Sequence, residues 1–432
     1  MNKKVSVQEL HRALVTMLAL AVLAAAVAAS AQTNPYKPIH QFTAPSGQYP
    51  SGSPVFDAAG NLYGVNLFGG RNTRSCSECG TAFKLSKNSG GQWIQSAIYR
   101  FGATSTDGIE PNGPLVVDAA GNLYGTTNGG GTYGEGTVFD LSPTSGGGLQ
   151  ETILYSFRGL GTGDGSLPLA GLVLDAAGNL YGTTSQGGAT TAGMVFELSP
   201  SSGGAWTESV LYSFTGGNDG RSPQAGLVFD RAGNLYGTTY SGGTSTVCGS
   251  GCGVAFELSP NPSGGWIESV LHSFNFTDGY RPAGSLVFDS IGNLYGMTTW
   301  GGNTVACTGG SSDGCGVVYE LVPSGGGWTF NQLLAFNATD GAYPVGNLIV
   351  DAAGNLRGTT FDGGNTPAAF GVAFTLSPNG SGGWTESVAH AFGGGIAGGG
   401  PLGLALDSSG NTFGMTEYGG SLGTGLVFEI TN

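Results

Sequence analysis

The sequence predicts an all-β protein, a seven-bladed β-propeller with four antiparallel strands in each blade. Three observations predict this fold. Among the 432 residues, 83 are Gly, 19 are Pro and only 10% are charged, a composition that interrupts long helices and favours strands and turns. A segment with four strand-like runs recurs seven times, as expected of propeller blades. The last copy lacks one strand, and a matching strand occurs near the N-terminus.

Each copy is anchored by an aspartate in a D-x-x-G-N segment. The seven aspartates are Asp57, Asp118, Asp175, Asp230, Asp289, Asp351 and Asp407. The six intervals from Asp57 to Asp407 span 350 residues, or about 58 residues per unit. The segment predicts a hairpin turn in which the aspartate caps the backbone and the glycine adopts positive φ.

The third unit shows the four expected strands, A to D. Strand A is Leu172–Leu174, and a turn from Asp175 to Asn179 leads into strand B, Leu180–Thr184. A Gly-Gly loop of variable length precedes strand C, Val195–Leu198, and a Ser-Pro-x-x-Gly-Gly turn leads to strand D. In strand D, we expect even spacing to place four side chains on one face: Trp206, Val210, Tyr212 and Phe214.

The two ends of the chain are predicted to share the last blade. The seventh unit stops after its strand C, Leu426–Ile430, whereas Tyr36–Phe42 resembles the strand D that ends at Phe274. Together they complete a blade and leave no unpaired ring edge. The predicted blade repeats are 51–101, 111–157, 168–214, 223–274, 282–336, 344–392 and 401–432 plus 36–42.

Residues 1–31 predict a signal peptide. Lys3, Lys4 and Arg12 precede an uncharged apolar run from Leu14 to Ala29, and Ala29-Ser30-Ala31 forms an A-x-A cleavage site. The run is short for a bilayer span of about 20 residues, although an uncleaved membrane anchor is the alternative. We therefore expect residues 32–432 to form one secreted or periplasmic domain with no stable membrane span after cleavage.

The charge of the chain argues against nucleic acid as a partner. The formal net charge is −14, and the leader holds 3 basic residues and 1 acidic residue, so the mature chain carries −16. Such a surface repels phosphate backbones and anionic lipid, although it could attract divalent cations.

The repeated phrases carry a family resemblance. GNLYGTT, followed by GG and then GxVFxLSP, resembles the GloVer (gloeo/verruco) tandem repeat of exported bacterial proteins. The resemblance covers essentially the whole mature chain, with departures at Arg357, Phe413 and Met415. Relatives often end in a sorting anchor, and the absence of one here favours a released or periplasmic protein. The resemblance implies little beyond the fold, because the family has no established activity.

The six cysteines form three pairs that are local in sequence. The pairs are Cys76 with Cys79, Cys248 with Cys252, and Cys307 with Cys315, each inside one loop between strands B and C. In an exported chain we expect three local disulfides. A zinc site and redox catalysis by Cys76-x-x-Cys79 are the alternatives, although no His lies in these loops and no helix N-terminus is expected to activate a thiol.

The strand order predicts that the B to C loops and the D to A links share one face. Only this face varies between units, so we expect function there. The side chains just before the Gly-Gly pairs differ between blades, and aromatic and amide groups among them could stack on and hydrogen-bond a sugar. The candidate ligand-binding residues are Phe68, Tyr240, Trp300, Phe361, Asp362, Glu417 and Tyr418, with Asn128, Gln186 and Ser241 at equivalent positions. The alternative is that these loops simply contain scattered exposed aromatics.

A second ring of residues consists of Asp-Gly aspartates in the D to A links. They are Asp107, Asp164, Asp219, Asp278 and Asp340. Repeated carboxylates on one face could bind calcium, which prefers several oxygen ligands. They could equally be turn residues, because each precedes a glycine and no D-x-D-x-D cluster accompanies them.

A catalytic constellation is not evident. The mature histidines, at positions 40, 272 and 390, occupy one strand D position where Tyr stands in other blades, which indicates a structural role. Glutamates repeated in strands C and D are expected at exposed edge positions: Glu197, Glu257, Glu320, Glu429, Glu208, Glu268 and Glu386. Asp362 and Glu417 lie on adjacent blades, so paired-carboxylate glycoside chemistry stays open.

We therefore expect a monomeric, exported, non-catalytic propeller that binds a glycan or an extracellular protein through its variable face. No cofactor is expected other than calcium. A polysaccharide-degrading hydrolase or lyase, or a structural envelope or matrix component, are the alternatives.

Overall fold

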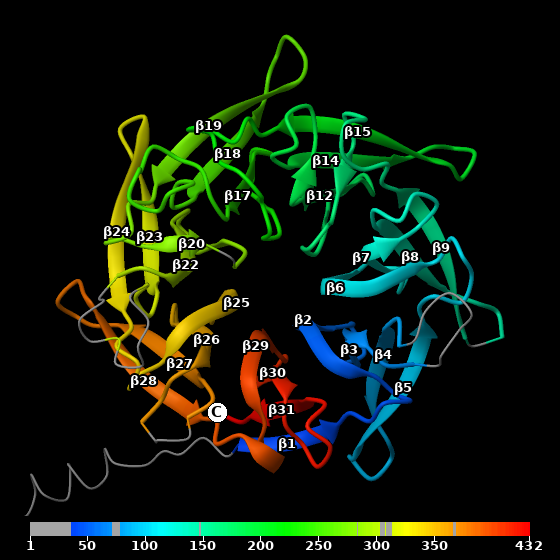
Figure 1. Cartoon of the computed structure of the whole chain (residues 1–432). Coiled ribbons are helices and arrows are strands. Elements are labelled where there is room, and N and C mark those ends of the chain that lie inside the picture. Colours follow the sequence, from blue (N-terminus) through cyan, green and yellow to red (C-terminus); the bar gives the residue numbers. More distant parts are fainter. Residues whose placement is uncertain are drawn as a thin grey trace, which may run out of the picture.

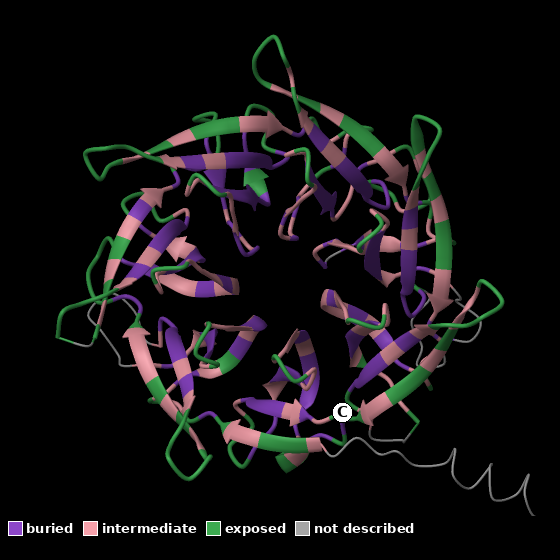
Figure 2. Cartoon of the chain, turned by 180° about the vertical axis from the view of Figure 1, so that it is seen from behind, coloured by how far each residue is buried: buried purple, intermediate pink, exposed green. Residues whose placement is uncertain are grey.

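The described residues form a ring of seven blades around a central axis (Figure 1), which confirms the predicted β-propeller. The computed structural model describes residues 36–70, 78–146, 148–282, 284–302, 307, 313–365 and 369–432. Within each blade, strand A lies nearest the axis and strand D lies at the perimeter (Figure 1). Buried residues gather in the middle strands, and exposed residues gather in the turns and along strand D (Figure 2).

The strands follow the repeat in order. Blade 1 comprises β2 (Gln48–Phe56), β3 (Leu62–Phe68), β4 (Thr81–Lys87) and β5 (Trp93–Arg100), and blade 2 comprises β6 (Gly108–Val117), β7 (Leu123–Gly130), β8 (Thr137–Pro143) and β9 (Leu149–Ser156). Blade 3 comprises β11 (Val173–Leu174), β12 (Leu180–Thr184), β14 (Met194–Pro200) and β15 (Trp206–Ser213), with β10 (Gly165–Ser166) paired to β13 (Gln186–Gly187). Blade 4 comprises β16 (Val228–Phe229), β17 (Leu235–Thr239), β18 (Val254–Pro260) and β19 (Trp266–Ser273).

The later blades keep the same plan. Blade 5 comprises β20 (Tyr280–Pro282) and β21 (Val287–Phe288), which both pair with β22 (Leu294–Trp300), followed by β23 (Val317–Ser324) and β24 (Gly327–Ala335). Blade 6 comprises β25 (Ala342–Val350), β26 (Leu356–Asp362), β27 (Val372–Pro378) and β28 (Trp384–Ala391). Blade 7 comprises β29 (Gly399–Leu406), β30 (Thr412–Tyr418) and β31 (Leu426–Ile430), preceded by the short 3₁₀-helix η1 (Gly395–Ala397).

The N-terminal strand β1 (Tyr36–Gln41) closes the ring, as the sequence predicts. It pairs antiparallel with β31, from Tyr36 opposite Ile430 to Gln41 opposite Leu426. Strand D of blade 7 therefore comes from the other end of the chain, and it gives this blade four strands like the others.

A buried aromatic pair joins each blade to the next. A Phe just after strand D meets the aromatic ring of strand C in the following blade, with centroids 4.9–5.2 Å apart and planes inclined by 62–68°. The pairs are Phe42–Phe83, Phe101–Phe139, Phe157–Phe196, Phe214–Phe256, Phe274–Tyr319, Phe336–Phe374 and Phe392–Phe428. These edge-to-face contacts in a closed interior hold neighbouring blades together.

The glycine of each Leu-Tyr-Gly segment makes room for that aromatic ring. A Cβ at Gly182 would lie 2.6 Å from Cζ of Phe196 and 2.8 Å from Cδ2 of Leu172, closer than carbon atoms approach in proteins. The repeated glycine in strand B is therefore required by packing rather than by backbone conformation.

The D-x-x-G-N turns have the predicted capping geometry. In blade 3, Oδ1 of Asp175 accepts the N–H groups of Ala177 and Asn179 at 2.9 and 2.8 Å, and Oδ2 accepts the Asn179 amide and the Tyr181 hydroxyl at 2.8 and 3.2 Å. Gly178 has φ +89°, as a turn glycine requires. Although burial acts in the opposite direction, the hydrogen bonds from Asn179, Ala177 and Tyr181 lower the pKa of Asp175.

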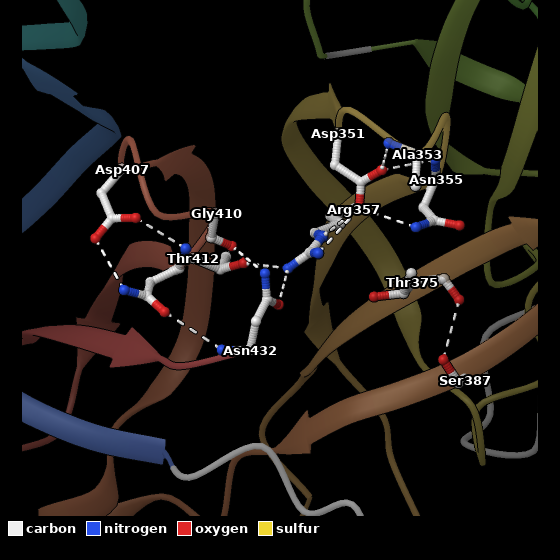
Figure 3. Close-up of polar contacts among 11 residues, drawn as sticks. Asp351, Ala353, Asn355, Arg357, Thr375, Ser387, Asp407, Gly410, Thr412 and Asn432 are labelled. Atoms are coloured by element: carbon white, nitrogen blue, oxygen red, sulfur yellow. Dashed lines mark hydrogen bonds and ion pairs between the residues drawn. The ribbon is translucent and has the colours of Figure 1, made fainter.

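Arg357 replaces the tyrosine of this network in blade 6 (Figure 3). Its guanidinium donates to Oδ2 of Asp351 at 2.9 and 3.2 Å, to the Thr412 hydroxyl at 2.9 Å and to Oδ1 of Asn432 at 2.8 Å. Thr412 begins β30 and Asn432 follows β31. The departure from the repeat therefore links blade 6 to the C-terminal end of blade 7.

Strand D carries a β-bulge that changes the expected face of its side chains. In blade 3 the register shifts between Val195 and Phe196, so Tyr212 opposes Val195 whereas Val210 opposes Phe196. Val210 is 42% exposed while Phe214 is fully buried. The prediction that even spacing places Trp206, Val210, Tyr212 and Phe214 on one face is therefore wrong, because the extra residue of the bulge breaks the two-residue period.

The glutamates of strand D are not at the exposed edge positions that the repeat suggested. Glu208, Glu268 and Glu386 are half-buried against the preceding blade, and each has an Oε1 atom that is buried with no partner among the described residues. Burial, followed by the charges of Asp164, Asp219 and Asp340 respectively, raises the pKa of each glutamate to about 7. The strand C glutamates are half-buried too, and Glu197 accepts the Tyr181 hydroxyl at 3.1 Å.

Candidate functional site

One face of the ring carries the B to C loops and the D to A links, as expected. The second glycine of each Gly-Gly pair donates its N–H to a D to A link of the same blade: Gly188 to Asp164, Gly243 to Gly217 and Gly302 to Phe276, at 2.8–2.9 Å. We call this the variable face. The opposite turn face carries the D-x-x-G-N hairpins and the C to D turns.

The candidate residues before the Gly-Gly pairs have a fixed backbone. The threonine two residues after the strand B glycine donates its hydroxyl to a carbonyl two residues later, from Thr298 to Trp300, Thr360 to Asp362 and Thr416 to Tyr418, at 2.8–2.9 Å. Gly301 then has φ +84°, and a Cβ there would lie 2.5 Å from the Phe276 carbonyl oxygen. These loops leave strand B in one defined direction, because both the hydroxyl bond and the close approach constrain it.

Sequence reasoning missed one residue per blade, the residue before the proline of strand A. It has φ between +53° and +60° in every blade: Tyr49, Glu110, Leu167, Ser222, Arg281, Tyr343 and Gly400. Positive φ is uncommon for residues other than glycine, and a following proline already restricts the backbone. The x-Pro pair that recurs in the D to A links could have located these residues from the sequence.

Each of these residues is held by the preceding blade. The N–H of Arg281 donates to the Cys252 carbonyl at 3.0 Å, and that of Tyr343 donates to the Cys315 carbonyl at 2.9 Å. Both acceptors belong to disulfide-bonded cysteines, Cys248–Cys252 and Cys307–Cys315, whose Cα atoms are 5.2 and 5.5 Å apart. Two predicted disulfides are thus confirmed, whereas Cys76 of the predicted Cys76–Cys79 pair lies outside the described residues.

Aromatic side chains meet Arg281 on blades 4 to 6. The Arg281 guanidinium carbon lies 4.8 Å from the ring centroid of Tyr240 and 4.7 Å from that of Tyr280. Tyr280 is the cross-strand partner of Trp300, and the Trp300 and Tyr343 rings are 4.6 Å apart. All five side chains are half-buried. We call this set the aromatic arc: Tyr240, Tyr280, Arg281, Trp300 and Tyr343.

Three further aromatic side chains continue onto blades 6 and 7. The Tyr418 ring lies 5.9 Å from Phe361 and 5.8 Å from Phe370. Gly400 provides the space, since a Cβ there would lie 2.6 Å from Tyr418 and 2.8 Å from Phe361.

The remaining predicted ligand-binding residues divide between two places. Exposed Asp362 and half-buried Glu417 both act electrostatically on Tyr418, whose pKa rises to about 12 chiefly because of burial. Burial also raises the pKa of Glu417. Phe68 instead contacts Tyr49 in blade 1, with the two ring centroids 6.0 Å apart. The structure therefore brings six of the seven predicted residues onto blades 4 to 7 and leaves Phe68 apart.

The Asp-Gly aspartates fold back onto their own links. Oδ2 of Asp164 accepts the Arg158 N–H and the Tyr155 hydroxyl at 2.9 Å each, and Asp219 and Asp107 make the same pair of contacts. Asp278 contacts His272 at 3.0 Å instead. Within the described residues, no group of three or more His, Cys, Asp and Glu could hold a metal ion. Calcium at these aspartates stays a prediction.

The histidines occupy one equivalent slot, as the repeat predicts. His272, His390 and His40 stand opposite Ala255, Ala373 and Val427, and Tyr212 stands opposite Val195 in the same way. Burial lowers the pKa of His40 and of His390 to about 4. His390 stacks on Tyr36 at 3.8 Å, which fits a packing role.

Two hollows among the described residues lie away from the variable loops. A cleft of about 650 Å³ opens on the turn face between blades 4 and 5, beside Tyr236, Ile291 and Trp328. A second hollow, of about 380 Å³, follows the central channel and is lined by strand A residues such as Gly52, Gly113 and Gly346. In the turn-face cleft, the Asp230 and Asp289 carboxylates cap their own turns.

The fold and the repeated turns define a class of protein, a propeller built from tandem repeats of one blade sequence. The profile of the Gloeobacter/Verrucomicrobia repeat family matches residues 26–175 and 145–308, and the chain belongs to this family. The resemblance seen in the sequence is thereby confirmed. A comparison with curated protein sequences found no match.

Several solved structures match the chain at low sequence identity. A putative gluconolactonase is 16% identical with a TM-score of 0.41, and the match covers 75% of this chain and 88% of that one. A polysaccharide lyase acting on ulvan is 14% identical with a TM-score of 0.49, covering 82% and 87%. A putative glucose dehydrogenase from Thermus thermophilus is 16% identical with a TM-score of 0.43, covering 73% and 94%. At these identities the likeness concerns the fold alone.

No helix among the described residues has the length and apolar character needed to cross a membrane.

Proposed function

We propose that this chain is an exported, non-catalytic carbohydrate-binding propeller whose ligand lies on the variable face over blades 4 to 7. The carrying observation is the gathering of half-buried aromatic side chains on that face, in the aromatic arc and around Tyr418. Aromatic faces stack on the apolar faces of sugar rings, while their polar groups and neighbouring carboxylates hydrogen-bond hydroxyls.

The backbone geometry supports a preformed site. Arg281 and Tyr343 are held at φ +57° and +59° by loops that disulfides close. A preformed surface lowers the entropic cost of binding.

Export is part of the proposal. Residues 1–31 have the pattern of a signal peptide, and the two disulfides suit an oxidising compartment. The predicted mature N-terminus is Gln32, which N-terminal sequencing of protein recovered outside the cytoplasm would test.

Binding is tested with the oxidised protein and a panel of plant, fungal and bacterial polysaccharides. We expect at least one polymer to raise the unfolding temperature, and Trp300→Ala and Tyr418→Ala each to weaken its binding at least tenfold without unfolding the free protein. Tyr133→Ala is the matched control, because Tyr133 is a 55% exposed aromatic in the B to C loop of blade 2.

Two results would contradict the proposal. Unchanged affinity in both variants would place the ligand elsewhere. Release of sugar products that Asp362→Asn or Glu417→Gln abolishes would make the protein a hydrolase or lyase.

A further inference from the structure

The aromatic arc contains one guanidinium, that of Arg281, whose hydrogen-bond donors have no partner among the described residues. Within the described residues the Arg281 guanidinium makes no ion pair and no hydrogen bond, and the ion pairs found there are His272–Asp278 and Arg357–Asp351. Arg357, by contrast, donates to Asp351, Thr412 and Asn432. A guanidinium offers five N–H donors in a planar fork. The donors of Arg281 are therefore available to a ligand.

Two tyrosines hold this cation in place. The Tyr240 and Tyr280 ring centroids lie 4.8 and 4.7 Å from the guanidinium carbon, within the range of cation–π attraction. Cation–π contact uses the charge of the guanidinium without any N–H···O hydrogen bond, so the N–H donors stay available. The backbone is fixed too, by the bond from the Arg281 N–H to Cys252 in a disulfide-closed loop.

Two aspartates of the D to A links in blades 4 and 5 are already engaged. Asp278 contacts His272 and accepts the Asn275 N–H, and Asp219 accepts the Tyr212 hydroxyl and the Thr215 N–H. More distant acidic groups are largely screened beyond about 8 Å at physiological salt. A carboxylate that reaches Arg281 can therefore pair with it despite the net charge of −14.

We propose that Arg281 binds a carboxylate of an acidic polysaccharide, a polyuronate, whose sugar rings lie along the aromatic arc. Planar guanidinium and planar carboxylate match in a bidentate pair. Trp300, the cross-strand neighbour of Tyr280, and Tyr343 beside it supply stacking surfaces for the adjoining residues of the polymer. This inference rests on the proposed function and names its ligand class.

The test compares polygalacturonate with its methyl ester, which has the same backbone without the charge. We expect calorimetry on the oxidised protein to show at least tenfold tighter binding of the acid form. Arg281→Gln should weaken that binding at least tenfold and leave binding of the ester unchanged, because only the acid form presents a carboxylate that the guanidinium can pair with. Arg281→Lys should restore only part of the affinity, since an ammonium cannot form the planar pair.

Arg221→Gln is the matched control, because Arg221 is an exposed arginine in the D to A link of neighbouring blade 4. Equal binding of acid and ester, or an Arg281→Gln variant that binds like the control, would overturn the role of Arg281 and leave the proposed function standing. Preference for a sulfated polymer over polyuronate would overturn the carboxylate assignment. Failure of the unmodified protein to bind any polysaccharide would overturn both proposals.

Discussion

At the scale of single residues, a missing side chain sets how closely two blades approach. Gly182 in strand B lies under the Phe196 ring, which in turn meets Phe157 of the preceding blade at 5.1 Å. Close-packed interiors respond to the addition of even one carbon. All seven blades have glycine at this position because the strand C aromatic ring occupies the space where a Cβ would lie. That ring belongs to a contact between blades and not to strand B itself.

Gly182→Ala is expected to destabilise the protein by about 1–3 kcal/mol, the usual cost of overpacking a core. Neither this glycine nor Gly380 has positive φ, and a Cβ at Gly380 would meet nothing within 4 Å. Gly380→Ala is thus the matched control, and denaturant unfolding of the two variants measures the difference. Equal stability would mean that Phe196 can move aside at little cost.

A second residue-scale prediction concerns the half-buried glutamates between blades. Glu208 has a pKa of about 7 because of burial and the charge of Asp164, against an ordinary value of 4.5. Between these two values the folded state binds more protons than the unfolded state, so this contribution falls as the pH rises from about 4.5 to about 7. Glu208→Gln should raise the unfolding temperature at pH 8 relative to the unmodified protein and lose that advantage near pH 4.5.

Glu257→Gln removes the same charge from strand C of blade 4, where the carboxylate accepts the Ser259 hydroxyl at 2.9 Å. Thermal unfolding of both variants from pH 4.5 to pH 8.5 separates the interface effect from a general change in net charge. A pH-independent difference between the Glu208→Gln variant and the unmodified protein would contradict the assignment.

At the scale of elements, disulfides brace the loops that hold the next blade. Cys248 and Cys252 are 4 residues apart and Cys307 and Cys315 are 8 apart, so chain entropy limits each bridge to about 2–2.5 kcal/mol. We expect the disulfides to act mainly by fixing the backbone of the next blade, because the carbonyls of Cys252 and Cys315 accept the N–H groups of Arg281 and Tyr343.

Replacing Cys248 and Cys252 together by Ser should lower the free energy of unfolding by no more than about 2 kcal/mol and accelerate amide exchange at Arg281. Exchange at Ser222, whose N–H donates to Ala192 in a loop without a disulfide, serves as the internal control. Unchanged exchange at Arg281 would show that the hydrogen bond holds without the bridge.

At the scale of the whole molecule, the ring is closed by a strand from the other end of the chain. Phe42, just after β1, is 1% exposed and meets Phe83 of blade 1 at 4.9 Å. The closure therefore joins blade 7 both to its own fourth strand and to blade 1, and ring stability depends on a contact between residues far apart in sequence.

Phe42→Ala should cost about 3–5 kcal/mol, as for other buried aromatics, and should accelerate hydrogen exchange first in β1 and β31. Lys37→Ala is the control, because Lys37 is an exposed residue of the same strand. Uniform acceleration in every blade would mean that the ring opens as one cooperative unit rather than at this closure.

Two sets of carboxyl groups have opposite effects on how the stability of the protein depends on pH. Capped turn aspartates such as Asp57, Asp175 and Asp351 have lowered pKa values, so their stabilisation is lost as the pH falls below about 4. The interface glutamates destabilise the fold as the pH rises toward 7. Maximum thermal stability is therefore expected in mildly acidic buffer, near pH 5, which a scan of unfolding temperature against pH would check.

The sequence by itself determined the fold, the closing strand, two disulfides and the capped turns, because each of these repeats or depends on neighbours in the chain. The Asp175 network, for example, joins residues within six positions of one another. Repetition also predicted the variable face, whereas ligand binding by the residues on it stays a prediction.

Only the tertiary structure decided which groups meet between blades. The bulge in strand D changes which side chains point inward, and the packing of neighbouring blades brings Glu208 within the electrostatic influence of Asp164 in the link between blades 2 and 3. Arg281 likewise gains its place from Tyr240 and Cys252 of the preceding blade. Such contacts depend on how adjacent repeats pack, and the pattern within one repeat holds no information on the side chain that the next repeat will present.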